Sequence, residues 1–110
     1  MSKFIIYFHQ QWVGDHSSEW FASRGPLARA VVAEMKEAGV LLFAGGLVEE
    51  IEEAFGADAD GHIRGPITIN SEYIGGLTII DVDSEADAKM WGAKVALACG
   101  WPQEIRKFKE

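Results

Sequence analysis

The sequence predicts a single α+β domain, and three observations lead to this class. The chain has 110 residues, the usual length of one domain. Apolar runs typical of buried strands alternate with two segments whose apolar residues recur every three or four positions, as in amphipathic helices. The composition is 48% hydrophobic and 25% charged, which is too apolar for a disordered chain. We therefore expect residues 1–110 to form one domain.

The first part of the chain predicts a strand followed by a helix. Residues 3–10 form an apolar, β-branched and aromatic run with too little polar alternation for a strand exposed on one face, so we expect it to be buried on both. A helical period spans residues 17–38 and is expected to end at Gly39. Pro26 is best tolerated in the first turn of a helix, so the main helix is expected to begin near it, after a short turn or irregular helix at residues 17–23.

The middle of the chain predicts two further strands with a hairpin between them. Residues 40–44 form a second apolar strand, and residues 73–82 carry the strongest strand pattern of the chain. Between them, residues 49–55 and 62–69 flank a turn sequence at residues 58–61, as in a hairpin. Six of the seventeen acidic residues fall in this insertion, so we expect it to be solvated.

The last part predicts a second helix and an edge strand. Asp83 or Ser84 is expected to cap the helix at its N-terminus, and Gly100 is expected to end it. The predicted buried stripe of this helix consists of Ala86, Met90, Ala93 and Leu97. Residues 103–108 are short and polar, which suits a strand at the edge of a sheet, where charges deter further pairing.

This order of elements is that of a ferredoxin-like βαββαβ fold with an antiparallel sheet and both helices on one face. Two helices cover only one face of such a sheet, yet residues 4–8 and 77–82 offer apolar side chains to both faces. A large exposed apolar face usually marks an interface, and a two-fold dimer is its commonest solution. We therefore expect a homodimer whose sheets pack face to face.

Charge and composition exclude several classes of function. The net charge is −7, from 10 basic and 17 acidic residues, which disfavours nucleic acid as a partner. No apolar run is long enough for a membrane helix, the N-terminus lacks the pattern of a signal peptide, and the single cysteine suits a reducing compartment, so we expect a cytoplasmic protein without a membrane partner. The glycine pairs lack the spacing of nucleotide-binding loops, and residues 58–61 are too short for a calcium loop, so no cofactor is expected.

Residues 65–91, GPITINSEYIGGLTIIDVDSEADAKMW, resemble the YCII-related family, in the branch that carries an Asp-Gly-Pro-Phe motif. The matching positions are Gly65-Pro66, Glu72, Ile74-Gly75-Gly76, Ile79–Ser84, Ala86 and Trp91, with a further likeness at Ala38–Leu42 and Gly46-Leu47. The resemblance implies a dimeric α+β barrel, formed by two ferredoxin-like subunits packed through their sheets. It implies no particular reaction, because relatives that share the barrel include isomerases, monooxygenases and dechlorinating enzymes.

The chain also departs from the pattern of this family. Arg64 stands where the motif has Asp, and Ile67 where it has Phe. Some relatives carry a His in the first helix and an Asp after the second strand as a proposed active-site pair. Residues 27–29 (Leu-Ala-Arg) and 45–46 (Gly-Gly) stand at these places, so the pair is not carried over.

The histidines are the candidates for acid/base chemistry. His9 and His16 follow the first strand, and imidazole titrates near working pH, so either residue is a candidate acid or base that Asp15 would orient. The structural alternative makes His9 a hydrogen-bonded residue at a strand end and His16 an exposed loop residue. Two histidines seven positions apart on a bend lack the spacing of a helical metal site, so no metal is expected.

Two tryptophans and two arginines are the candidates for ligand binding. Trp12 and Trp20 would line a pocket for a flat or apolar ligand, although tryptophan more often packs in a core or an interface. Arg24 and Arg64 would pair with a ligand carboxylate, or else with a neighbouring Asp or Glu.

The sequence thus supports a protein that binds a small organic molecule in a pocket of a homodimeric barrel, with or without His-based acid/base chemistry. The absence of the family's His/Asp pair shifts the balance toward binding without chemistry. The alternative is a non-catalytic structural or interaction module whose apolar sheet face serves only dimerisation.

Overall fold

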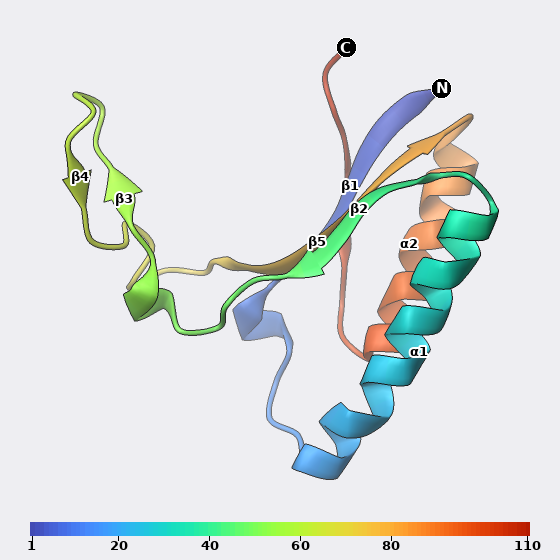
Figure 1. Ribbon diagram of the computed structural model, residues 1–110, viewed down its shortest axis with the longest axis horizontal. Helices are drawn as coiled ribbons and strands as arrows, with labels where there is room; N and C mark the ends of the chain where they lie inside the picture. The colour runs from blue at the N-terminus through green and yellow to red at the C-terminus, as the bar shows by residue number, and fades with distance from the viewer.

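The computed structural model describes residues 1–110 as an α+β structure in which an antiparallel sheet packs against two helices (Figure 1). The main strands are β1 (Ser2–His9), β2 (Leu41–Gly46), β5 (Ile74–Val82) and β6 (Glu104–Lys107), and the helices are α1 (Ser18–Glu37) and α2 (Glu85–Cys99). The strand order is β2-β5-β1-β6, and all neighbouring strands are antiparallel. The predicted α+β class and antiparallel sheet are confirmed.

The core lies between the sheet and the helices. It consists of Phe4, Ile6, Met35, Ile80, Val82, Ala88 and Trp91. Because side chains alternate along a strand, the neighbouring residues turn to the opposite face of the sheet. There Ile5 lies opposite Ile79, and Tyr7 lies opposite Leu77, and all four side chains are only half-buried. The two central strands therefore carry apolar side chains on a face that no helix covers.

Helix α1 begins earlier than the sequence predicts. It runs without a break from Ser18 to Glu37, so the expectation that it starts near Pro26 is wrong. The Ser17 hydroxyl caps it by accepting the backbone N–H of Trp20 at 3.1 Å. Aromatic contacts anchor this first part of the helix to the domain, and such packing offsets the hydrogen bond that Pro26 cannot make.

Helix α2 buries a different face from the predicted one. All four residues of the predicted stripe are exposed, and Leu97 is 79% exposed. The buried residues are Ala88, Trp91, Gly92 and Ala98. Gly92 explains the choice of face, because a Cβ atom there would clash with the side chain of Ile105 on β6. The helix thus approaches the sheet closely only along the face that carries Gly92 and the large Trp91 ring.

The predicted ends of the helices and the edge strand are confirmed. Gly39 follows α1 with a φ of 74°, and Gly100 follows α2 with a φ of 90°, the left-handed conformation that glycine adopts most easily. Ser84 caps α2 by accepting the backbone N–H of Asp87 at 3.1 Å. Strand β6 lies at the edge of the sheet next to β1.

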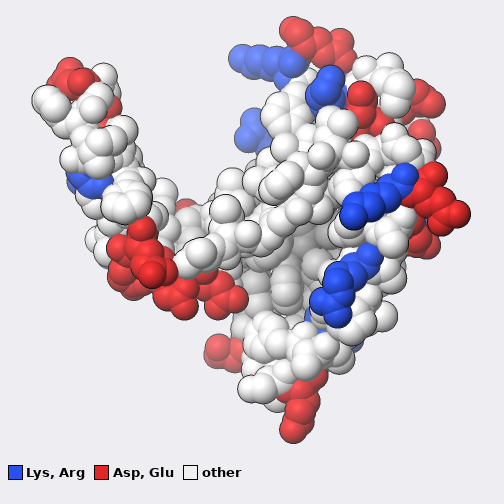
Figure 2. Space-filling view, in the orientation of Figure 1, with Lys and Arg blue, Asp and Glu red and all other residues white.

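A hairpin arm projects from the body of the molecule (Figure 1). It contains the short helix η2 (Ile51–Glu53) and the paired strands β3 (Gly56–Ala57) and β4 (Ile63–Arg64), at the place where the sequence predicts a hairpin. The radius of gyration is 15.4 Å, against roughly 13 Å for a compact chain of this length. The acidic side chains of the arm stand out in Figure 2. No helix of the structure has the length and apolar character needed to cross a membrane.

The position of the core predicts unequal losses of stability when two large apolar side chains are truncated. Met35 is fully buried, so Met35→Ala should lower the free energy of unfolding by about 2–5 kcal/mol. Leu97→Ala, at an exposed position of α2, should change it by less than about 0.5 kcal/mol. Urea unfolding followed by tryptophan fluorescence measures both. Equal losses would show that α2 buries the face predicted from the sequence instead.

Candidate functional site

The main cavity is a groove between α1 and the sheet, with a volume of about 700 Å³. This volume lies in the range of pockets that hold small organic ligands. Figure 2 shows the molecule hollowed beside α1, with mostly uncharged atoms in the hollow. Residues of α1, β2 and β5 line the groove, together with Cys99 at the end of α2 and Trp101 just after it.

Small residues keep the floor of the groove open. Gly45 and Gly46 of β2 and Gly76 of β5 line it and offer no side chain to fill it. Gly76 also admits the ring of Phe8, which would lie 2.9 Å from a Cβ atom at this position. The Phe8 ring in turn lies 5.1 Å from the ring of Trp101. The floor is therefore apolar and partly aromatic.

A cluster of aromatic rings around Trp20 lies beside the groove. Phe21 and Trp101 of this cluster line the groove, whereas Trp20 itself lines neither hollow. The His16 ring stacks on Trp20 with a centroid distance of 3.6 Å, and the rings of Phe21 and Trp101 lie at 5.3 and 6.1 Å from it. The guanidinium of Arg24 lies 5.0 Å from the centre of the Trp20 ring. The structure thus brings together three residues that the sequence suggested, His16, Trp20 and Arg24.

The charged side chains along the groove are all positive. Arg24, Arg29 and Lys36 of α1 line it, and no Asp or Glu does. The ion pairs of the chain are His9 with Glu72, His62 with Asp58, and Lys94 with Glu34, so none involves a cation of the groove. Lys and Arg side chains over α1 flank the hollow in Figure 2. In a protein with a net charge of −7, the main cavity is thus lined by cations and by no carboxylate.

Three buried side-chain N–H groups at the groove have no hydrogen-bond acceptor within the protein. They are Arg24 Nε, Trp101 Nε1 and Gln103 Nε2, and all three residues line the groove. Leaving a buried donor unsatisfied costs about 1–3 kcal/mol, so native proteins rarely do so without a reason. The only other buried side-chain atom of this kind is Asp81 Oδ1. The unsatisfied donors therefore gather at one place.

A second hollow of about 560 Å³ adjoins the groove and shares Phe8, Phe21, Gly46 and Trp101 with it. Asp15 and His16 line this second hollow. The Nε2 of His16 lies 3.0 Å from the carbonyl oxygen of Val13, which accepts its hydrogen. Val13 thus orients the His16 ring, the role that the sequence suggested for Asp15.

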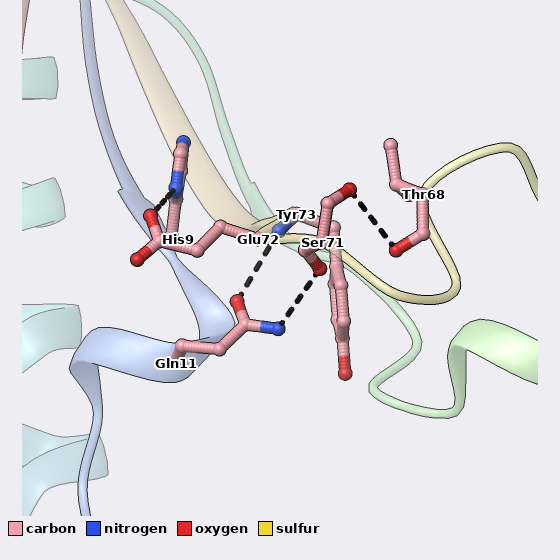
Figure 3. A network of polar contacts seen from close by, with 6 residues as sticks. All are labelled: His9, Gln11, Thr68, Ser71, Glu72 and Tyr73. Carbon is pink, nitrogen blue, oxygen red and sulfur yellow. Dashed lines mark hydrogen bonds and ion pairs between the residues drawn. The ribbon is translucent and has the colours of Figure 1, made fainter.

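His9 and Trp12 lie in a different cluster, outside the two hollows. Figure 3 shows His9 beside Glu72. The Nδ1 of His9 lies 2.7 Å from Oε2 of Glu72, and the His9 ring stacks on Trp12 at 4.6 Å. A carboxylate only accepts, so Nδ1 carries the hydrogen and Nε2 is left free. Gln11 holds the Glu72 segment in place, because its Oε1 accepts the backbone N–H of Tyr73 at 3.2 Å.

The arm carries Arg64 and a group of possible metal ligands. Arg64 is exposed on β4 and lines neither hollow, so the structure does not bring it to the other candidates. Asp58, Asp60 and His62 offer ligand atoms within 4.8 Å of one another, all at the surface. Asp58 Oδ1 accepts the backbone N–H groups of Asp60 and His62, which accounts for these residues as the turn of the hairpin.

Sequence reasoning missed several residues at these sites. The sequence marks Glu72 only by its match to a family pattern, although Glu72 lies two residues before β5, which pairs with β1. Arg29 and Lys36 are seven positions apart, a spacing that places them on one face of a helix. This spacing is the sequence signal that indicates a pair of cations on the same face of α1. Nothing local in the sequence marks Trp101 or Gln103. Comparison with known proteins yields no matching family model and no similar curated protein.

Cys99 lines the groove as the only cysteine of the chain. Burial raises the pKa of its thiol, and the positive charge of Arg24 acts in the opposite direction. Because only the thiolate is a good nucleophile, this residue is a poor one. It remains a specific chemical label for the groove.

The raised pKa of Cys99 predicts how stability changes with pH. The folded state favours the neutral thiol, so this contribution to stability is complete below the ordinary pKa of 9.0 and is lost as the pH rises above it. Cys99→Ala should therefore lose less of its free energy of unfolding than the wild type between about pH 8 and pH 10. Urea unfolding at both pH values measures the difference. Identical losses would show that the thiol has an ordinary pKa.

Proposed function

We propose that this protein binds a small organic molecule in the groove between α1 and the sheet, as a homodimer similar to the YCII-related proteins. The observation that carries the proposal is the groove itself, which is open, floored by glycines and bordered by buried N–H groups without acceptors. Packing alone would favour side chains that fill such a space and partners that satisfy such donors. A bound molecule accounts for both features.

The proposed ferredoxin-like subunit and dimeric barrel rest on the topology and on the uncovered face. The main elements follow one another as β1, α1, β2, β5, α2 and β6, and the hairpin arm is inserted between β2 and β5. The face opposite the helices carries the half-buried Ile5, Tyr7, Leu77 and Ile79, and Phe43 of β2 is 57% exposed. A second copy packed on this face would bury it. The charge balance and the lone cysteine support a cytoplasmic protein that does not bind nucleic acid.

The binding proposal is tested with two probes of the same shape, naphthoate and naphthamide. We expect at least one of them to slow the alkylation of Cys99 by iodoacetamide in proportion to the occupied fraction, because Cys99 lines the groove. Ala28→Phe should abolish this protection, since Ala28 lines the groove, whereas Ala30→Phe, at an exposed position of α1 outside it, should preserve it. If neither probe slows the alkylation of the wild type, the binding proposal is wrong.

The dimer proposal predicts different outcomes for two isoleucines on the two faces of the sheet. Ile79→Asp places a charge on the uncovered face and should give a folded monomer. Ile6→Asp places it in the core, where the side chain is 1% exposed, and should unfold the protein. Light scattering reports the mass, and circular dichroism reports the fold. A stable Ile79→Asp dimer would exclude an interface on this face.

The pair of His9 and Glu72 favours acid/base chemistry as a second candidate function. A carboxylate that holds Nδ1–H leaves Nε2 of the same ring free to exchange a proton, and here the two groups lie 2.7 Å apart. His9 is 27% exposed, so a molecule can reach it from solvent. Because His9 lies outside the groove, its substrate would occupy a separate place.

The second candidate is tested by the rate of a simple proton-transfer reaction in two histidine variants. A base opens a nitrobenzisoxazole by removing its ring proton, and a positioned base does so faster than an exposed side chain, so the rate reports the positioning of the His9 ring by Glu72. We expect His9→Gln to lower this activity by about 100-fold, in line with the contribution of a positioned base, and His62→Gln, at an exposed histidine, to leave it unchanged. Equal rates in both variants would remove the second candidate.

A further inference from the structure

We propose that the ligand of the groove is an organic carboxylate with an apolar body, and that Arg24 and Arg29 hold its carboxylate group. The inference rests on the proposed function, because it names the chemical class of the molecule bound at the same site. It is carried by the charge, the unsatisfied donors and the placement of two guanidinium groups along α1.

Positive charge without a partner is the first observation. Arg29 and Lys36 form no ion pair with any carboxylate of a chain that has 17 acidic residues. A groove lined by cations alone attracts anions and repels cations. A neutral ligand would leave this charge without a counterpart.

The placement of Arg29 is the second observation. A Cβ atom on Gly25 would lie 3.1 Å from Nη1 of Arg29, so the guanidinium of Arg29 reaches back along the helix to Gly25. Arg24 is the next residue in the chain, and its Nε is buried without an acceptor. Nη1 of Arg24 donates to the carbonyl oxygen of Leu97 at 3.4 Å, so this guanidinium lies toward the end of α2, and both arginines line the groove. Guanidinium groups match the planar geometry of a carboxylate.

The neutral donors are the third observation. The Trp101 indole N–H and the Gln103 amide lack acceptors, and both residues line the groove together with Arg24. A carboxylate has two oxygens that accept several hydrogen bonds, so a group of this kind suits a site bordered by several donors. The glycine floor and the rings of Phe8 and Phe21 then suit an apolar body attached to it.

The test compares naphthoate with naphthamide, which have the same apolar body and differ in charge. Isothermal titration calorimetry should show naphthoate binding at least about 10-fold more tightly, as expected for hydrogen bonds to a charged group. Arg29→Met, which keeps an apolar stem at an exposed position, should reduce naphthoate affinity about 10-fold and leave naphthamide affinity unchanged. Lys89→Met removes the same charge from an exposed position of α2 outside the groove and serves as the control.

The outcomes separate this inference from the function on which it rests. Equal affinity for the two probes, or equal losses for both in Arg29→Met, would overturn the carboxylate inference and leave the binding proposal intact. A loss of naphthoate affinity in Lys89→Met equal to that in Arg29→Met would also overturn it, because the effect would then be one of net charge. Binding of neither probe would overturn the proposed function together with the inference.

Discussion

The central constraint on this structure is that two helices must cover a four-stranded sheet. Helices α1 and α2 pack against each other and bury the apolar side chains of β1 and β5. The edge strand β2 ends in Gly45 and Gly46, and Gly75 and Gly76 follow the first residue of β5, so these strands leave space beneath α1. The groove is therefore a direct consequence of the layer geometry and of glycine at this end of the sheet.

Basic and acidic side chains are distributed unevenly over this structure. The net charge is negative, yet the face of α1 over the groove presents unpaired cations, and many of the acids lie on the arm (Figure 2). Trp20 connects this face to the end of α2, because it stacks on His16, lies under Arg24 and packs near Trp101. The aromatic cluster thus positions the polar groups that border the groove and anchors the first turns of α1.

The strands and helix ends were predictable because they depend on local sequence. Apolar runs mark β1 and β5, and Gly39 and Gly100 mark where the chain leaves each helix. The buried face of α2 was not predictable, because alanines occur on several of its faces and the choice depends on a contact between Gly92 and a distant strand.

The same distinction applies to the candidate site, where contacts between sequence neighbours were predictable and contacts between distant segments were not. The ring stack of His16 and Trp20 joins residues four positions apart, and sequence had suggested both of them. His9 and Glu72 are 63 positions apart and meet only through the register of β1 with β5. That register cannot be derived from either segment alone, and the same is true of the approach of Trp101 to the groove.

The most direct test of this account is a crystal structure of the protein purified from its source without added ligand. We predict density for a bound molecule in the groove, with an acceptor group within hydrogen-bond distance of Arg24, Trp101 or Gln103. Carboxylates of a second copy seated against Arg24 and Arg29, with the groove filled by its side chains, would contradict the account. The groove would then be an interface between copies of the chain.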